Sequence, residues 1–213
     1  MLKMVCLANS IREGLRCVAG IDLSNGRWVR PVPPNGRGIP THCTFIGERE
    51  IRPLDIVQVD LSPPLFNTRY QCENRVMPSY NRKLVGSLTP SEIEEYCDDT
   101  SPILHTHDKG VTPDYLETLE PENWKSLQLV RVTDASFQRN YFKSNRWEAS
   151  FSDSEGHQYC LKITDPIFCK KLENSDEMDR ECMFTVSLAE EAWSPNEETP
   201  KKHYKLIAAV IEL

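Results

Sequence analysis

Short apolar runs recur along the chain in two groups, and their pattern predicts strands. Four runs lie near the N-terminus and five follow later, at residues 3–11, 16–23, 27–32, 54–61, 127–134, 146–153, 158–166, 182–190 and 204–213. In the run 158–166, Tyr159, Leu161 and Ile163 share one face of a strand, because successive side chains alternate between faces. This alternation and the β-branched residues are typical of sheets with one face on a core.

The segment between the two groups, residues 63–125, has a different pattern, because seven prolines interrupt it. Thr89, Pro90 and Glu92 have the spacing of a capping box, which predicts a short helix. Thr112-Pro113 predicts a second one. A long stretch without secondary structure is improbable in a compact protein, so we expect this connector to pack against the strands.

Two groups of strands without a long helix predict a mainly β protein. We expect two small antiparallel barrels or sandwiches, at residues 1–62 and 126–213, joined by the connector at 63–125. Each group contains a strand, turn, strand unit, at 19–32 and at 147–166, and in each unit the second strand ends in a proline. The two halves therefore resemble each other in architecture, although their residues barely match.

The first of these units carries two local signals. Asn25-Gly26 between its strands predicts a hairpin, because a type I′ turn needs positive φ at both central positions. Pro31 in the second strand lacks the N–H that a sheet ladder uses, so we expect an edge strand or a strand end there.

Composition is that of an ordinary globular protein. The 213 residues are 39% hydrophobic, which is enough for one larger core or two small ones. No run approaches the roughly 20 apolar residues that cross a bilayer, and the apolar stretch at the N-terminus is too short for a signal peptide. We therefore expect a cytoplasmic protein with no membrane partner.

The eight cysteines are scattered and include no Cys-x-x-Cys pair. Cys17 and Cys160 lie inside strand-like runs, as small buried hydrophobes do in a reducing compartment. The only candidate ligands for a structural zinc site are His105 and His107 together with distant cysteines. We expect free thiols, no bound metal and no cofactor.

Charge is unevenly divided along the chain, whose net charge is −7. Residues 1–86 contain 12 Lys and Arg against 7 Asp and Glu, whereas residues 87–213 contain 13 against 25. The acidic second half argues against indiscriminate wrapping on nucleic acid, and the basic first half leaves room for a local anion site. Alternatively, the charges are simply spread over solvated surfaces.

Several motifs give the chain a resemblance to the dual OB-containing domain, a module of two oligonucleotide/oligosaccharide-binding (OB) barrels found mostly in prokaryotic proteins. They are Arg16-Cys17-Val18-Ala19-Gly20-Ile21, Trp28-Val29-Arg30-Pro31, residues 54–61, Glu73-Asn74, and residues 161–166, 186–188 and 204–212. The family often has Pro before and Trp after the Glu-Asn step, where this chain has Cys72 and Arg75. The resemblance covers nearly the whole chain and implies two small OB-like antiparallel β-barrels. It also implies binding of a nucleic acid or nucleotide.

Trp28 and Arg30 are two positions apart on one predicted strand, so their side chains project from the same face, about 7 Å apart. In an OB-type barrel such an indole can stack on a base while the guanidinium contacts a phosphate or a base edge. In the alternative interpretation, Trp28 plugs the end of the barrel and Arg30 covers its ring as a cation–π lid. Arg16 opens the neighbouring strand and either joins this patch or is solvated.

Aromatic and cationic residues interleave a second time at residues 69–75. Tyr70 stands beside Arg69 and near Arg75, and Glu73-Asn74 lies between them. This polar pair either contacts a ligand or caps the connector onto the first barrel. The candidate ligand-binding residues are therefore Arg16, Trp28, Arg30, Tyr70, Glu73, Asn74 and Arg75.

Catalytic signatures are missing from the sequence. It contains no Gly-rich phosphate loop, no His-Glu-x-x-His or Gly-x-Ser-x-Gly motif and no tight carboxylate cluster. Asp165, which precedes Pro166, is expected to form an Asx-type turn rather than to act as a functional carboxylate. We therefore expect no catalytic residue.

The sequence thus favours a non-catalytic module that binds single-stranded nucleic acid or a nucleotide. By analogy with the family, it would be an accessory of a prokaryotic defence or nucleic-acid processing system. Two alternatives stay open. One is a protein–protein adaptor that docks on a partner subunit through its acidic second barrel, and the other is an enzyme that acts on a nucleotide.

Overall fold

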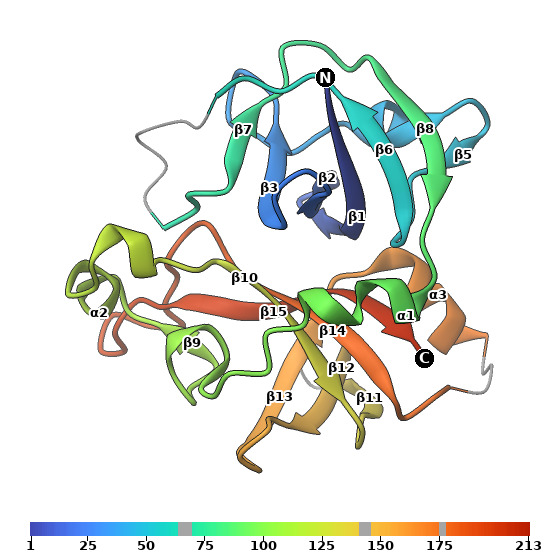
Figure 1. The fold of residues 1–213 in the computed structure, drawn as a ribbon. Coiled ribbons are helices and arrows are strands. Elements are labelled where there is room, and N and C mark those ends of the chain that lie inside the picture. Colours follow the sequence, from blue (N-terminus) through green and yellow to red (C-terminus); the bar gives the residue numbers. More distant parts are fainter. Residues whose placement is uncertain (64–69, 141–145, 175–177) are drawn as a thin grey trace.

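Two β-sheets face each other in the computed structural model of the chain (Figure 1). It describes residues 1–63, 70–140, 146–174 and 178–213. The N-terminal sheet has the strand order β7-β3-β2-β1-β6-β8. Its strands are β1 (Leu2–Arg12), β2 (Leu15–Asp22), β3 (Arg27–Val32), β6 (Asp55–Val59), β7 (Asn74–Val76) and β8 (Arg82–Ser87). A separate small hairpin consists of β4 (Phe45–Ile46) and β5 (Arg49–Glu50).

The C-terminal sheet has the order β10-β14-β15-β13-β12-β11, and β9 adds to it by pairing with β15. Its strands are β9 (Gly110–Val111), β10 (Leu127–Val132), β11 (Ser136–Asn140), β12 (Arg146–Ser152), β13 (Gln158–Ile163), β14 (Cys182–Leu188) and β15 (His203–Glu212). Each sheet contains a parallel pair, β3 with β7 and β13 with β15. Both β3 and β13 are second strands of the two predicted strand, turn, strand units.

The helices are short, and most of them lie in the part of the sequence that connects the N-terminal sheet to the C-terminal sheet. They are α1 (Pro90–Ile93), α2 (Pro113–Glu117), α3 (Pro166–Glu173) and the 3-10 turns η1 (Thr41–Thr44), η2 (Glu94–Tyr96), η3 (Ile103–His105) and η4 (Pro121–Asn123). The predicted capping box is present, because the Thr89 N–H donates to the Glu92 carboxylate at 2.8 Å. Within the described residues, no helix has the length and apolar character that crossing a membrane requires.

The mainly β prediction is confirmed, and all nine predicted strands are present. The predicted connector at 63–125 contributes more to the sheets than expected. Its residues form β7 and β8 of the N-terminal sheet and β9 of the C-terminal sheet. The N-terminal sheet therefore extends to Ser87.

β3 is not an edge strand, because β7 and β2 flank it. The other alternative drawn from Pro31, a strand end, is confirmed, because Pro31 is the last residue but one of β3. The ladder to β7 uses the neighbours of the proline. The Arg30 N–H donates to the Glu73 carbonyl at 2.9 Å, and the Met77 N–H donates to the Val32 carbonyl at 2.8 Å. Pro31 thus lies between Arg30, whose N–H donates to the ladder, and Val32, whose carbonyl accepts, so these bonds do not need its missing N–H.

The hairpin at Asn25-Gly26 forms, but with a longer loop than a two-residue type I′ turn. β2 and β3 pair at Asp22 and Arg27. Gly26 has a positive φ of 70°, whereas Asn25 has not. The Asp22 carboxylate explains the longer loop, since it accepts hydrogen bonds from the Ser24 N–H and from the Asn25 side chain, both at 2.9 Å.

β1 is buried on both faces and joins the two sheets. Its Val5 and Leu7 belong to one apolar cluster with Leu129 of β10 and Met183 of β14. The Thr185 hydroxyl of β14 also donates to the Leu7 carbonyl at 2.6 Å. The two sheets are therefore held together by a continuous apolar contact. Residues at the edge of this contact are held in place by both sheets.

Candidate functional site

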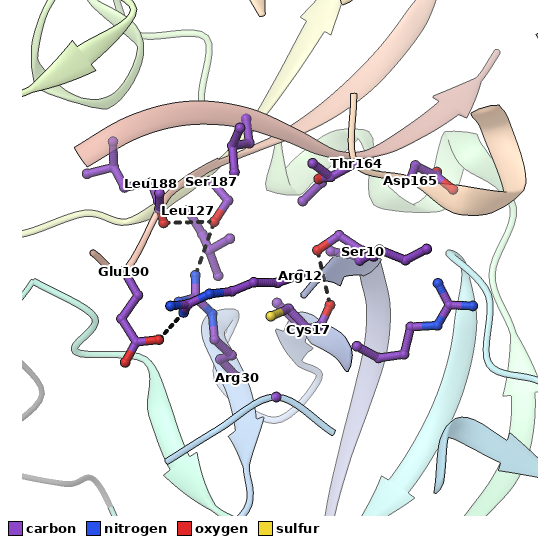
Figure 2. A pocket seen from close by; sticks show the side chains of 18 of the residues that line it. Ser10, Arg12, Cys17, Arg30, Leu127, Thr164, Asp165, Ser187, Leu188 and Glu190 are labelled. Carbon is purple, nitrogen blue, oxygen red and sulfur yellow. Dashed lines mark hydrogen bonds and ion pairs between the residues drawn. The ribbon is translucent and has the colours of Figure 1, made fainter. Parts of the chain in front are cut away.

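A cleft of about 660 Å³ opens at this rim, between the two sheets. On the N-terminal side it is lined by β1, β2, β3 and the loop at residues 36–38. On the C-terminal side it is lined by β13, β14, β15 and the start of α3, and Figure 2 shows side chains from both sides facing each other across it. Its volume lies within the range of about 300–1,000 Å³ that is usual for small-ligand sites.

The lining of the cleft is more basic than the protein as a whole. Six cationic side chains line it, namely Arg12, Arg16, Arg30, Arg37, Arg146 and Lys162, against three acidic ones, Glu13, Asp165 and Glu190. The whole chain, in contrast, has a net charge of −7. Because the cleft walls exclude water, the field of these cations is less screened than on an open surface.

Three of the five arginines, Arg12, Arg16 and Arg30, are held by carboxylates. Arg12 reaches across the cleft to Glu190, as Figure 2 shows, and lies 3.2 Å from Glu191. Arg16 pairs with Glu50, with 2.8 Å between the guanidinium Nε and the carboxylate. These ion pairs hold the cleft walls in place. They also partly neutralise Arg12 and Arg16, which therefore attract an anionic ligand less strongly than unpaired arginines would.

Arg30 is buried and links the two sheets. Its Nη2 lies 2.8 Å from the Glu73 carboxylate and donates to the hydroxyls of Ser126 (3.2 Å) and Ser187 (3.4 Å). Ser126 in turn donates to Glu73. Figure 2 shows Arg30 pointing from the N-terminal side toward Ser187. The guanidinium thus has a structural partner on each side of the cleft, while its side chain still lines the wall.

Arg37, Arg146 and Lys162 have no ion pair with any residue that the structure describes. Arg37 comes from the loop after β3, Arg146 begins β12 and Lys162 lies on β13. Burial and then the nearby Arg146 lower the pKa of Lys162 below its usual value. Arg146 and Lys162 are neighbouring cations with no ion pair to a described residue, so an anion is most favoured in this part of the cleft.

Asp165 has the role in a turn that the sequence predicts. Its carboxylate accepts hydrogen bonds from the N–H groups of Ile167 (2.9 Å) and Phe168 (3.0 Å) and so caps α3. A third N–H, that of Val210, donates to it at 3.2 Å. Burial raises the pKa of this carboxyl, although the three hydrogen bonds act against the rise. The N-terminus of α3 is therefore already satisfied by its own chain.

Of the predicted pair Trp28 and Arg30, the structure places only one residue in the cleft. Arg30 lines the cleft, but Trp28 does not. Trp28 is half-buried and packs against both apolar clusters between the sheets, one with Leu7 and one with Leu127. Among the described residues no cation–π contact links Arg30 to the Trp28 ring. Both side chains of the pair therefore face the other sheet.

The other predicted residues divide between the cleft and the core. Arg16 and Asn74 line the cleft, and Glu73 lies behind it as the partner of Arg30. Tyr70 is buried, and its ring packs edge-on against Trp124 at a centroid distance of 5.4 Å. The predicted neighbour Arg69 lies outside the described residues.

Arg75 lies away from the cleft. Its guanidinium donates to the carbonyls of Cys72 (2.8 Å) and Asn74 (2.9 Å). It therefore tightens the turn that leads into β7 instead of joining the basic lining.

Sequence reasoning missed Arg12, Arg37, Arg146 and Lys162. A signal existed for Lys162, because it occupies the polar face of the alternating strand 158–166. Nothing in the sequence pattern could place it opposite Arg37, since the two come from different halves of the chain.

The family profile described as "Dual OB-containing domain" matches residues 2–210. The crystal structure of the tetrameric p202 HIN2 is similar over 99% of this chain and 90% of that chain, at 10% sequence identity and a TM-score of 0.31. A TM-score of this size supports no argument about function. No curated protein matches the chain.

Proposed function

Because the chain belongs to the dual OB-containing domain family, we propose that it binds a phosphate-bearing ligand, a short single-stranded nucleic acid or a nucleotide, in the cleft between its two sheets. OB folds are barrels that bind oligonucleotides and oligosaccharides. The observation that carries the proposal is a set of three cations, Arg37, Arg146 and Lys162, that have no ion pair with the described part of the chain. They lie in a basic cleft of ligand size on an acidic protein.

Phosphate explains this arrangement better than other anions do. The cations come from both sides of the cleft, so they can contact successive phosphates or the several oxygens of one. Arginine suits this role because its planar guanidinium binds phosphate oxygens in pairs. The apolar part of the lining, such as Leu127 and Ile163, offers a surface for a base.

The test is a binding titration on a double variant, Arg146→Ala with Lys162→Ala. Fluorescently labelled single-stranded RNA and DNA of about eight nucleotides would be titrated at several salt concentrations, with nucleoside mono- and triphosphates as competitors. The matched control is Arg27→Ala with Lys83→Ala, which removes the same charge from exposed residues outside the cleft that have no ion pair with the described residues.

We expect the cleft variant to bind at least about tenfold more weakly at low salt. Its slope of log K against log salt should be shallower by about 1.4, since each lost phosphate contact on a single strand contributes about 0.7. The control variant should keep the slope of the parent. Equal losses in both variants, or no binding by the parent, contradict the proposal, and the latter would favour the adaptor interpretation.

A further inference from the structure

Two histidines and one aspartate meet at the end of the C-terminal sheet remote from the cleft. Asp153 and His157 lie in the turn between β12 and β13, and His107 lies between η3 and β9. One ligand atom from each of the three side chains can be chosen so that all lie within 4.8 Å of one another. None of the three lines the cleft, so this site is independent of the proposed function.

The carboxylate at the centre of this group is fixed by its surroundings. The side chain of Asp153 is only 2% exposed. It accepts hydrogen bonds from the Ser101 hydroxyl (2.7 Å) and from the N–H groups of Glu155 (3.0 Å) and His157 (2.9 Å). Gly156, with φ of +85°, closes the turn that brings these donors together. The carboxylate is thus held in place before any ligand arrives.

The two imidazole rings stack on each other over this carboxylate. Their centroids are 3.7 Å apart, and the planes of His107 and His157 differ by 26°. The Nδ1 of His107 lies 3.8 Å from Asp153 Oδ2, and the Nδ1 of His157 lies 3.4 Å from Asp153 Oδ1. Both nitrogens therefore face the same carboxylate.

These separations are too long for good hydrogen bonds, whose N···O distances are about 2.7–3.2 Å. They are closer to the spacing of ligands around a metal ion, and rotation of one stacked ring would point both Nδ1 atoms at the same ion. Two ligands of a tetrahedral zinc ion, each about 2.1 Å from the metal, lie about 3.4 Å apart. We propose that His107, Asp153 and His157 form a binding site for one divalent transition-metal ion, with Zn²⁺ as the preferred ion.

The chemistry of the donors fits this ion. Imidazole nitrogen and carboxylate oxygen are ordinary ligands of Zn²⁺, and three protein ligands leave a fourth position for water. Both histidine side chains are almost half exposed, at 46% and 44%, so the metal can enter from solvent. The Tyr159 hydroxyl, 3.4 Å from both His107 Nδ1 and Asp153 Oδ2, stands where it can bond to that water.

A metal also removes an electrostatic conflict in the stack. Two protonated imidazoles 3.7 Å apart repel each other. Two neutral rings can each turn an Nδ1–H toward the carboxylate, but at 3.8 and 3.4 Å these contacts are too long for good hydrogen bonds. A dication between the three groups attracts both lone pairs and the carboxylate, and zinc binding at these nitrogens needs neutral imidazole.

The experiment measures zinc binding by the 213-residue chain with isothermal titration calorimetry, after treatment with a chelator and in the presence of a phosphine reductant. The variants are His107→Asn and His157→Asn. The control is His42→Asn, which removes an exposed histidine elsewhere. Every one of these proteins keeps all eight cysteines, so adventitious binding to thiols is the same in each.

We expect the parent and the His42 variant to bind one more Zn²⁺ per chain than the site variants, or to bind it at least tenfold more tightly. Zinc should also raise the melting temperature of the parent and of the control, but not of the site variants. Circular dichroism checks that the variants are folded. Indistinguishable zinc binding by all four proteins overturns the proposal, as does an equal shift in melting temperature.

Discussion

Replacing Glu73 by alanine should destabilise the whole molecule, because it leaves the Arg30 guanidinium buried between the two sheets without its carboxylate partner. The side chains of Arg30 and Glu73 are only 9% and 5% exposed, and 2.8 Å separates their charged atoms. The pair therefore belongs to the buried class, in which loss of one partner costs about 3–5 kcal/mol. An exposed pair would contribute only about 0–1 kcal/mol.

The magnitude can be tested by comparing variants that remove one charge with a double variant that removes both charges. Glu73→Ala and Arg30→Ala each leave one buried charge without its partner, whereas Arg30→Met with Glu73→Leu removes both charges and keeps the volume. We expect each single variant to lower the free energy of unfolding by about 3–5 kcal/mol and the double variant to stay within about 2 kcal/mol of the parent. Glu73→Gln, which can still accept from Ser126, should lie between these values.

Urea unfolding followed by tryptophan fluorescence measures these free energies. A single transition is expected, because the apolar cluster around Leu7 joins the two sheets. The reasoning is refuted if Glu73→Ala costs less than about 1 kcal/mol, or if the double variant costs as much as both single variants together. Either result would mean that the pair is solvated and that Arg30 is free to serve a ligand.

Three further substitutions test the packing and electrostatics. Trp28→Ala should lower the free energy of unfolding in urea by about 3 kcal/mol, because the ring packs between the sheets, and ligand affinity should be unchanged; an affinity loss without destabilisation would contradict this. Gly20→Ala should abolish or severely reduce folding in a thermal melt, since its Cβ would lie 1.9 Å from the Val5 carbonyl oxygen; a normal melting temperature would contradict it. Burial lowers the pKa of Lys205 to about 7. The unfolded chain, with a Lys pKa of about 10.4, therefore binds more protons, and the free energy of unfolding should rise by about 1.5 kcal/mol from pH 7 to 8.5. Lys205→Met should remove that rise, and an equal rise in both proteins would count against it.

Most of the longer strands could be predicted from their apolar runs, but β8 and β11 were missed because their sequences, RKLVGS and SFQRN, contain few apolar residues. β4, β5 and β9 contain two residues each and β7 contains three, so no period exists to be detected. α3 is a different case. Asp165 and Pro166 are an N-cap and a first helical residue, and together they signal a helix start. The expectation of an Asx turn there was right, but the helix that follows was not inferred from it.

The candidate site was less accessible from sequence, because it depends on how two sheets meet. Charge counted over long segments did not indicate the basic cleft, because Arg146 and Lys162 lie in the half of the chain that is acidic overall. The metal site shows the same limit. His107 and His157 are 50 positions apart, and only the pairing of β9 with β15 and of β12 with β13 brings their turns together.

The pairing of Trp28 and Arg30 on one face follows from the same meeting of sheets. That face of β3 looks toward the C-terminal sheet, where the indole joins the apolar clusters and the guanidinium joins Glu73, Ser126 and Ser187. The Trp28-x-Arg30 and Glu73-Asn74 motifs are thus two sides of one contact, because β3 and β7 pair with Arg30 opposite Asn74. A contact that joins the sheets also sets the width of the cleft at their rim. In the proposed function the motif residues Trp28, Arg30, Glu73 and Asn74 position the walls of the cleft. The direct ligand contacts are assigned there to Arg37 and Arg146, which no motif contains, and to Lys162, which lies in the motif at residues 161–166.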